Sequence, residues 1–371
     1  MQLIIDAKKL SKGLSAIKQA IGKDPVILSC VLLSVGEFRV EFKAFNGVIG
    51  ITHSLLCDVV EGAGTEIAVP YALFSTLVSK LDGIIDLNLR SELGEETSPK
   101  ARASLKESIL EIKTDSSTFN LNLMDAEEFP NLPVLDKVGV VMDWVEAEGI
   151  LKSVAAIASD EISKQILTGV CLKQVDGRTE LVATDSNRLV VRKLDEDLTA
   201  ETTTIPKELV NAAIAALKGQ SEVQFSREGN LVKFTSEQTK IIGFTIQGDY
   251  PKYQQLIPSK CKQAVEVDVN SLLGAINLVS PIANDNQLVT LKLSGDKIEL
   301  TATSGLGTAN AEILAAQIEE DLEIAFNIKY LVSGLISLSG RVQIRFNSWN
   351  QPAIISSDNY TYLIMPVQVR K

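Results

Sequence analysis

The chain has 371 residues, of which 45% are hydrophobic and 22% charged, and its formal net charge is −11. This composition is that of a globular protein, and the length exceeds what one core supports, so we expect two to three domains. The sequence also argues against a membrane protein, because no stretch approaches the roughly 18 apolar residues of a membrane-spanning helix. The first residues lack a signal-peptide pattern.

The first predicted unit begins with a helix. Its apolar residues Leu10, Leu14 and Ile17 recur at a spacing that places them on one helical face. A second helix is predicted just after Pro70, and the unit closes with a strand that runs into Pro130. Strands are predicted at 26–35, 38–45, 48–56 and 85–90, with hairpin turns at Gly36-Glu37 and Asn46-Gly47.

The same order of elements returns twice. The first helix recurs as Ile150/Val154/Ile157 and as Leu272/Ile276/Val279, and the second helix recurs after Pro206 and after Asn327. The closing strand recurs before Pro251 and before Pro366. Further strands are predicted at 231–246, 297–304 and 341–348, with turns at Asp176-Gly177 and Gly295-Asp296.

This internal repeat predicts three tandem domains at 1–130, 131–256 and 257–371. The first domain is longer because of an insertion at about 90–108, which has the composition of a loop. Each domain is expected to be α+β, with two helices packed on antiparallel sheet.

The residue inventory argues against an enzyme. His53 is the single histidine, it lies in a strand-like segment, and no Ser/His/Asp or Cys/His pair is evident. The four cysteines form no CxxC pair, so we expect no metal site, and no glycine-rich phosphate loop is present. They are Cys30, Cys57, Cys171 and Cys261. An enzyme built on carboxylates such as Asp160/Glu161 is kept as a remote alternative. We expect no catalytic residue and no cofactor.

The charge of −11 counts against a nucleic-acid partner, because DNA affinity rests largely on Lys and Arg. The distribution of lysines points the other way, since several lie opposite the apolar stripes of equivalent predicted helices. We expect these lysines to face DNA: Lys8, Lys12, Lys23, Lys152, Lys207, Lys218 and Lys329. The simpler interpretation is that they are only solvated.

The segments "LVATDSNRLVV", "QGDYPKYQQLIP", "FNIKYLVSGL" and "YLIMPVQV", together with three units over the whole chain, resemble the bacterial sliding clamp family, the beta subunit of DNA polymerase III. The resemblance implies three clamp-type domains that form a ring as a head-to-tail homodimer, with helices lining a hole for duplex DNA. It implies a processivity factor in DNA replication, without catalysis or sequence-specific DNA binding. Localisation would be cytoplasmic and nucleoid-associated, with no membrane contact.

The resemblance also implies a peptide-binding pocket between the second and third domains. It would bind short linear motifs of the replicative polymerase, the clamp loader, and repair and translesion polymerases. Residue by residue, the matching positions are Leu167, Thr184, Arg188, Leu189, Pro251, Leu256, Leu288, Asn327, Tyr330, Leu363, Ile364, Met365, Pro366 and Val367. Aliphatic walls, an adaptable methionine and a few polar groups suit a peptide guest.

For the dimer interface the matching residues are Phe119 and Leu121 on a first-domain edge strand and Ile282 in the third domain. Three departures from the family pattern are Ser186-Asn187 in place of Gly-His, Gln254-Gln255 in place of a basic pair, and an end at Arg370-Lys371 beyond the expected last residue. A non-DNA peptide-binding scaffold of the same fold is the alternative, since the third unit offers only Lys329.

Overall fold

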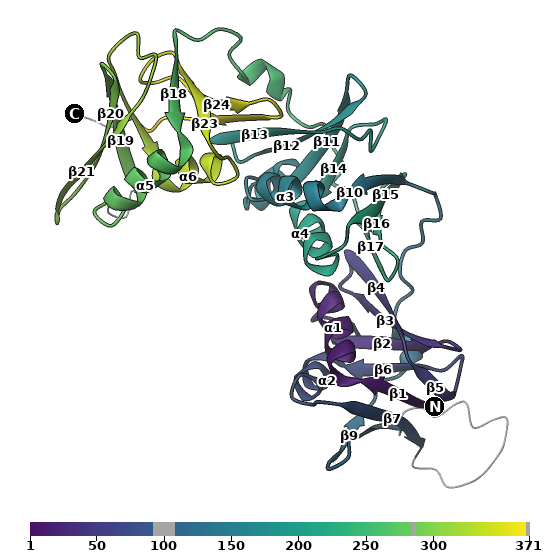
Figure 1. The fold of residues 1–371 in the computed structure, drawn as a ribbon. Coiled ribbons are helices and arrows are strands. Elements are labelled where there is room, and N and C mark those ends of the chain that lie inside the picture. The colour runs from purple at the N-terminus through teal and green to yellow at the C-terminus, as the bar shows by residue number, and fades with distance from the viewer. Residues whose placement is uncertain (92–107, 284–286, 369–371) are drawn as a thin grey trace. The chain divides into compact units, whose positions relative to one another are not determined.

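The computed structural model describes residues 1–91, 108–283 and 287–368. It divides into two compact units (Figure 1). The first unit holds residues 1–145 and 211–245, and the second holds 146–210 and 246–371. Most of the predicted insertion at 90–108 lies outside the described residues.

The first unit contains two antiparallel sheets. The smaller has the order β5-β1-β7-β8-β9, and the larger has the order β10-β15-β16-β17-β4-β3-β2-β6. The strands of the smaller sheet are β1 (Gln2–Asp6), β5 (Asp58–Glu61), β7 (Ile84–Ser91), β8 (Ser108–Lys113) and β9 (Thr118–Asn122). Those of the larger sheet are β2 (Cys30–Val35), β3 (Arg39–Phe45), β4 (Ile49–Leu56), β6 (Glu66–Pro70), β10 (Val140–Asp143), β15 (Glu222–Glu228), β16 (Leu231–Thr235) and β17 (Thr239–Phe244).

The second unit also contains two antiparallel sheets, with the orders β14-β11-β12-β13-β25-β24-β23-β18 and β21-β20-β19-β22. The strands of the larger sheet are β11 (Gly169–Val175), β12 (Arg178–Thr184), β13 (Arg188–Leu194), β14 (Thr203–Pro206), β18 (Gln263–Asp268), β23 (Arg341–Phe346), β24 (Ala353–Ser357) and β25 (Tyr360–Ile364). Those of the smaller sheet are β19 (Leu288–Ser294), β20 (Lys297–Ser304), β21 (Gly307–Leu314) and β22 (Leu322–Asn327).

The two eight-stranded sheets have the same topology when the strand order of one is read in reverse. Each sheet joins strands that belong to different sequence repeats. In the first, β17 pairs with β4, with Ile241 opposite Ile51. In the second, β13 pairs with β25, with Leu189 opposite Leu363. The sequence analysis did not predict these pairings between repeats. Edge strands of neighbouring repeats pair because an unpaired edge leaves backbone donors and acceptors unsatisfied.

These shared sheets explain why the two compact units do not follow the repeat. Residues 211–245 of the second repeat lie with the first unit, and residues 146–210 lie with the second. The division at 1–130, 131–256 and 257–371 describes the sequence repeat and stays a prediction.

All six predicted helices form: α1 (Ala7–Ile17), α2 (Tyr71–Val78), α3 (Trp144–Ala155), α4 (Lys207–Ala216), α5 (Val269–Val279) and α6 (Ile328–Leu335). An aspartate precedes the first helix of every repeat. Asp6, Asp143 and Asp268 each accept a hydrogen bond from a backbone N–H of the first turn that follows. These caps satisfy donors that the helix itself leaves unpaired.

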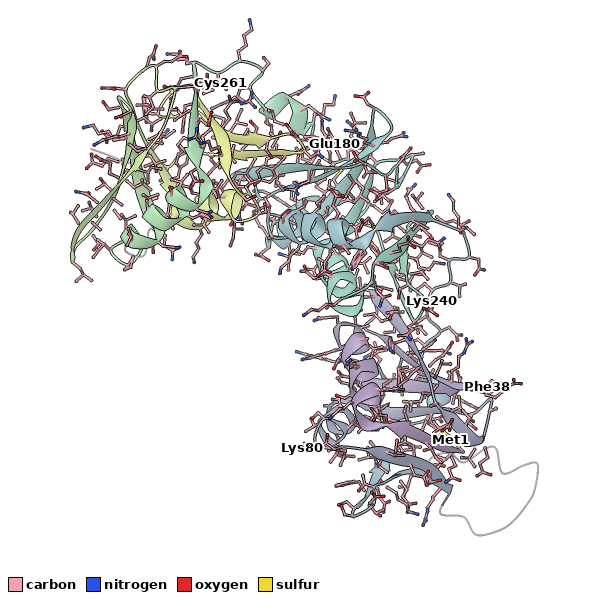
Figure 2. All side chains as sticks on the ribbon, viewed as in Figure 1. Met1, Phe38, Lys80, Glu180, Lys240 and Cys261 are labelled. Carbon is pink, nitrogen blue, oxygen red and sulfur yellow. The ribbon has the colours of Figure 1, made fainter. Side chains whose placement is uncertain are left out.

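The cores contain the predicted apolar stripes, since Leu10, Leu14 and Ile17 are buried. The hairpin turns also form where they were predicted, and Phe38 projects into solvent between β2 and β3 (Figure 2). The strand predicted at 26–35 is wrong in its first part, because Val26–Ser29 forms a 3-10 turn. Ser29 Oγ donates to the Val26 carbonyl, and Ile27 and Leu28 pack into the core without a strand partner.

No helix among the described residues is long and apolar enough to cross a membrane.

Candidate partner-binding site and DNA-facing lysines

The predicted peptide pocket centres on the pairing of β13 with β25 in the second unit. Arg188 lies opposite Ile364, and Leu189 lies opposite Leu363. The ladder continues past β25, because the Met365 N–H donates to the Asn187 carbonyl over 2.9 Å. Residues far apart in sequence are therefore brought together by strand pairing.

Strand alternation divides these residues between two faces of the sheet. Leu189 and Leu363 pack in one apolar cluster with Tyr253 of the connector that follows Pro251. Arg188 lies on the opposite face, against α6. Leu189 and Leu363 therefore form an apolar floor on the connector face, while Arg188 and its strand partner Ile364 lie on the helix side of the sheet.

Arg188 is held by polar and aromatic neighbours from both repeats. Its Nε donates to Asp185 Oδ2 at 2.8 Å, its Nη1 donates to Ser333 Oγ at 2.9 Å, and its guanidinium carbon lies 4.5 Å from the centre of the Tyr330 ring. Burial alone would lower the pKa of Arg188, but its hydrogen bond with Asp185 and the neighbouring Tyr362 outweigh burial and raise it. A largely buried guanidinium with this carboxylate partner is a stable cation that links β13 to α6.

The remaining third-repeat residues lie around the start of α6. Asn327 caps the helix by accepting from the Tyr330 N–H at 3.3 Å, and Leu288 lies opposite Asn327 across β19 and β22. The Val367 N–H donates to the Ala325 carbonyl at 2.8 Å, which holds the segment with Pro366 along β22.

Further predicted pocket residues of the second repeat lie in the connector around Pro251 and in the 3-10 turn before β11. Tyr253 is buried, and its hydroxyl donates to Glu180 Oε2 at 2.5 Å. Burial, and then that hydrogen bond, raise the pKa of Tyr253. Pro251 and Leu256 stay exposed on either side of this anchor, and Leu167 is buried just before β11.

The floor residues are buried, and the predicted pocket residues beside them are open to a guest. Leu189 is 2% and Leu363 is 5% exposed, as expected of core residues, whereas Met365 is 39% and Leu256 is 55% exposed. Thr184 is buried, and its hydroxyl donates to the Arg188 carbonyl at 2.7 Å.

Asp185 and Ser333, which hold Arg188, were not among the site residues predicted from the sequence. For Asp185 the local signal was an acidic residue three positions before an arginine at a strand start. For Ser333 no local signal exists, since it lies 145 residues away.

Six of the seven predicted DNA-facing lysines are exposed: Lys8, Lys12, Lys23, Lys152, Lys218 and Lys329. Lys8 lies 3.5 Å from Asp82, and both side chains remain open to solvent. Lys207 differs, because its side chain is only 17% exposed and is ion-paired with Asp160. The hydrogen bond and charge of Lys207 lower the pKa of Asp160. Lys207 thus offers less free charge than the sequence suggested.

The predicted dimer residues lie at or near sheet edges. β9, with half-buried Phe119 and buried Leu121, is an edge strand of the five-stranded sheet, and β21 is an edge strand of the four-stranded sheet. Ile282 follows α5 and is half-buried. Glu312 on β21 is paired with Lys297 of its own sheet at 2.7 Å.

The groups considered for catalysis have structural surroundings. His53 Nδ1 lies 2.9 Å from Thr239 Oγ1, and burial lowers the pKa of this histidine. Burial raises the pKa of Cys171 to about 11, so its thiol stays protonated at neutral pH. Among the described residues, no cluster of three or more His, Cys, Asp or Glu side chains could hold a metal ion.

The comparisons with known proteins agree with this geometry. Residues 146–252 match the DNA polymerase III beta subunit, central domain, and residues 254–368 match its C-terminal domain. The chain is 31% identical to the beta sliding clamp of Synechocystis sp. and 29% identical to that of Synechococcus elongatus, in both cases over 100% of each chain. The chain belongs to the beta sliding clamp family. The solved DNA polymerase sliding clamp of Bacillus subtilis has the same fold, with a TM-score of 0.89 at 23% identity over 100% of both chains.

One departure from the clamp pattern has a structural consequence. Ser186 stands where glycine is usual and has a φ of +78°, a left-handed conformation that favours glycine. Asp185 compensates by accepting from the Asn187 and Arg188 N–H groups at 2.9 and 3.0 Å. In the first repeat of this clamp, Gly47 occupies the equivalent turn, and Asn46 accepts from Val48 and Ile49 in the same way.

Proposed function

We propose that the protein is a DNA sliding clamp that encircles duplex DNA and tethers the replicative polymerase, which gives processivity without catalysis. The observation that carries this proposal is the similarity to beta sliding clamps over the full length of both chains, with 31% identity to the Synechocystis protein. The fold match to the Bacillus subtilis clamp supports the same architecture.

A clamp of this kind holds DNA by enclosure. The net charge of −11 is compatible with that function, because a few exposed helix lysines supply a weak attraction to phosphates while the remaining surface stays acidic. Phosphate contacts carry no sequence information, so the ring can move along any duplex. Tight binding would oppose sliding, which is consistent with the partial neutralisation of Lys207 by Asp160.

Linear motifs of partner proteins would dock beside β13 and β25. The support is the apolar floor of Leu189 and Leu363, the exposed Met365 and Leu256 beside it, and the fixed polar groups at the start of α6. A flexible thioether next to rigid aliphatic side chains can adapt to motifs of different sequence. We assign the clamp loader, repair polymerases and translesion polymerases to this pocket, and nucleoid association follows from DNA binding.

The test of DNA encirclement is retention on a circle. The purified protein is loaded by its clamp loader onto nicked circular DNA, and the DNA is isolated by gel filtration. We expect the protein to co-elute with the circle and to be released when a restriction enzyme linearises the DNA. The double variant Lys12→Glu/Lys152→Glu should load more slowly. Its affinity for DNA should depend less on salt, with the magnitude of the slope of log affinity against log salt reduced by about 2. Release on linearisation should remain complete.

The matched control for that experiment is Lys292→Glu, which reverses an exposed lysine on β19 rather than on a helix. It should load normally. Retention of the protein on linear DNA would contradict encirclement. Unaltered loading by the double variant would mean that Lys12 and Lys152 do not face DNA.

The ring would form from two copies of the chain, with β9 of one closing onto β21 of the other and Ile282 packing nearby. The pairing of Glu312 with Lys297 within one chain leaves less charge for the interface, so we expect an apolar contact that resists salt. Light scattering should give a mass near twice 40.2 kDa at both low and high salt. Dissociation that rises steeply with salt would contradict this interface.

The alternative is a peptide-binding scaffold that does not enclose DNA. It is favoured by the ion pair of Lys207 and by the small number of exposed helix lysines in the third repeat. Failure to be retained on circular DNA, with peptide binding intact, would support this alternative.

A further inference from the structure

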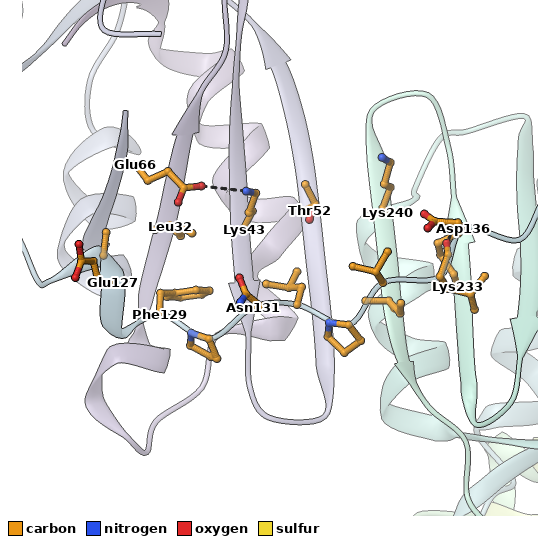
Figure 3. A pocket seen from close by; sticks show the side chains of 17 residues that line it. Leu32, Lys43, Thr52, Glu66, Glu127, Phe129, Asn131, Asp136, Lys233 and Lys240 are labelled. Carbon is orange, nitrogen blue, oxygen red and sulfur yellow. Dashed lines mark hydrogen bonds and ion pairs between the residues drawn. The ribbon is translucent and has the colours of Figure 1, made fainter. Parts of the chain in front are cut away.

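A groove crosses the face of the first eight-stranded sheet that is opposite α1, in a different compact unit from the predicted pocket. The connector at 129–136 runs over the strands and covers a cavity of about 590 Å³ (Figure 3). Its floor includes side chains of β2, β3, β4, β16 and β17. All of these residues belong to the first unit, so the groove is a feature of one compact body.

Three lysines, Lys43, Lys233 and Lys240, line the floor of this groove. Lys240 on β17 lies opposite Thr52 on β4, and Thr52 lies opposite Lys43 on β3, which makes one continuous row across three strands. Lys233 on β16 belongs to the next row, opposite Ile242. Figure 3 shows Lys43 between Glu66 and Thr52, with Lys240 and Lys233 beyond Thr52.

The second eight-stranded sheet has no charge at the equivalent positions. Its matching row is Thr361, Val191 and Val182 on β25, β13 and β12, and the position equivalent to Lys233 is Ile354. The two sheets therefore share a topology, but three floor positions that are neutral in one carry lysines in the other.

The connectors pack alike on both sheets. Phe129 is buried in a cluster with Leu32, as Tyr253 is buried in a cluster with Leu189. Leu132 fills the space above β4, where a Cβ on Gly50 would lie only 3.0 Å from Leu132 Cδ2. The apolar part of the first groove is thus already occupied by the connector, and the charged part remains open.

The charges of the groove are unevenly distributed. At one end, Glu66 is hydrogen-bonded to Ser34 and lies 3.2 Å from the Lys43 ammonium. Figure 3 places Glu127 at that same end. At the other end, Lys233 donates to the Leu135 carbonyl at 2.5 Å and Lys240 stays exposed, with Asp136 as the nearby carboxylate. Burial, and then the like charge of Lys240, lower the pKa of Lys233.

We propose that this groove is a second protein-docking site, which binds an extended acidic peptide segment of a partner protein with its carboxylates on Lys233 and Lys240. Adjacent strands lie about 4.8 Å apart, so the row from β17 to β3 spans about 10 Å, the length of roughly three extended residues. Two ammonium groups against one carboxylate favour an anionic guest, and the connector's prolines and leucines offer contacts for its aliphatic side chains.

The probe is a fluorescein-labelled octapeptide of alternating glutamate and leucine, titrated with the full-length protein at low salt and followed by anisotropy. Lys240→Glu should weaken binding by about five- to tenfold. The matched control Lys80→Glu reverses an exposed lysine after α2, elsewhere on the same unit (Figure 2), and should leave binding unchanged. Replacing the peptide's glutamates by glutamines should abolish binding.

Three results would overturn the proposal. The glutamine peptide could bind as well as the glutamate peptide. Lys80→Glu or Lys152→Glu could weaken binding while Lys240→Glu does not, which would place the peptide on the helix lysines. Inorganic phosphate at equal concentration could displace the peptide, which would make this a site for small anions only. Met365→Ala should have no effect here, so the outcome is independent of the pocket beside β25.

Discussion

Gly334→Ala in α6 is expected to destabilise the second unit, by about 1–3 kcal/mol of unfolding free energy. A Cβ at this position would lie 2.4 Å from the Tyr362 ring on β25, far inside van der Waals contact. The Gly334 carbonyl also accepts from the Tyr360 hydroxyl at 2.7 Å, and the Tyr362 hydroxyl donates to the Tyr330 carbonyl at 2.7 Å. These hydrogen bonds hold α6 against β25, so neither element can shift freely to make room for an added methyl group.

The chain offers a matched control for this variant. Gly274 lies in α5, the other helix of the same repeat, and a Cβ there would meet no atom within 4 Å. Gly274→Ala should stabilise the protein by about 0.5–1 kcal/mol, because alanine favours the helix more than glycine does. Thermal and urea unfolding of both variants, followed by circular dichroism, would measure the difference. Equal midpoints for the two variants would contradict the packing of α6 on β25.

Met365→Ala is expected to weaken partner peptides by about 1–3 kcal/mol, which corresponds to roughly five- to 150-fold in Kd. Met365 is exposed beside the apolar floor, so its truncation removes guest contacts without opening the core. Its backbone bond to Asn187 does not involve the side chain and is retained. Anisotropy with a labelled peptide that carries a clamp-binding motif of the replicative polymerase would measure the change.

Leu189→Ala should weaken the same peptide, but it carries a second effect. Leu189 is packed in the cluster with Tyr253 and Leu363, and truncation of a buried leucine costs about 2–5 kcal/mol of stability. The thermal midpoint therefore has to be measured beside the affinity. Ile336→Ala, at an exposed position after α6 and outside the predicted pocket, is the neutral control. Unchanged peptide affinity in Met365→Ala would mean that the pocket lies elsewhere.

Local patterns in the sequence determined the helices and turns. The apolar spacing of Leu10, Leu14 and Ile17 was sufficient to place α1, and turn pairs such as Asn46-Gly47 placed the hairpins, because these features depend on neighbours within a few residues. Each repeat also begins its first helix after an aspartate, a capping signal that can be read without any tertiary contact.

The pairing of strands that are far apart in the sequence could not be predicted from such local patterns. The pairing of β4 with β17, and of β13 with β25, requires two sheet edges with compatible register to meet in space. The alternation of apolar and polar residues within one strand does not determine which strand it pairs with. The same holds for side chains. Arg188 stays a predicted pocket residue, but its bond to Ser333 on α6 has no counterpart in the local sequence.

For this protein the sequence by itself determined the repeat, the six helices, the hairpin turns and the resemblance to the clamp family. Only the tertiary structure decided which lysines keep their charge free, since Lys207 meets Asp160 across 47 residues. It also decided that Lys43, Lys233 and Lys240 line the floor of one sheet, whereas the equivalent positions of the other hold the uncharged Val182, Ile354 and Thr361. The reason is physical: periodicity is set by the local backbone, whereas burial and electrostatic pairing are set by residues that only folding brings together.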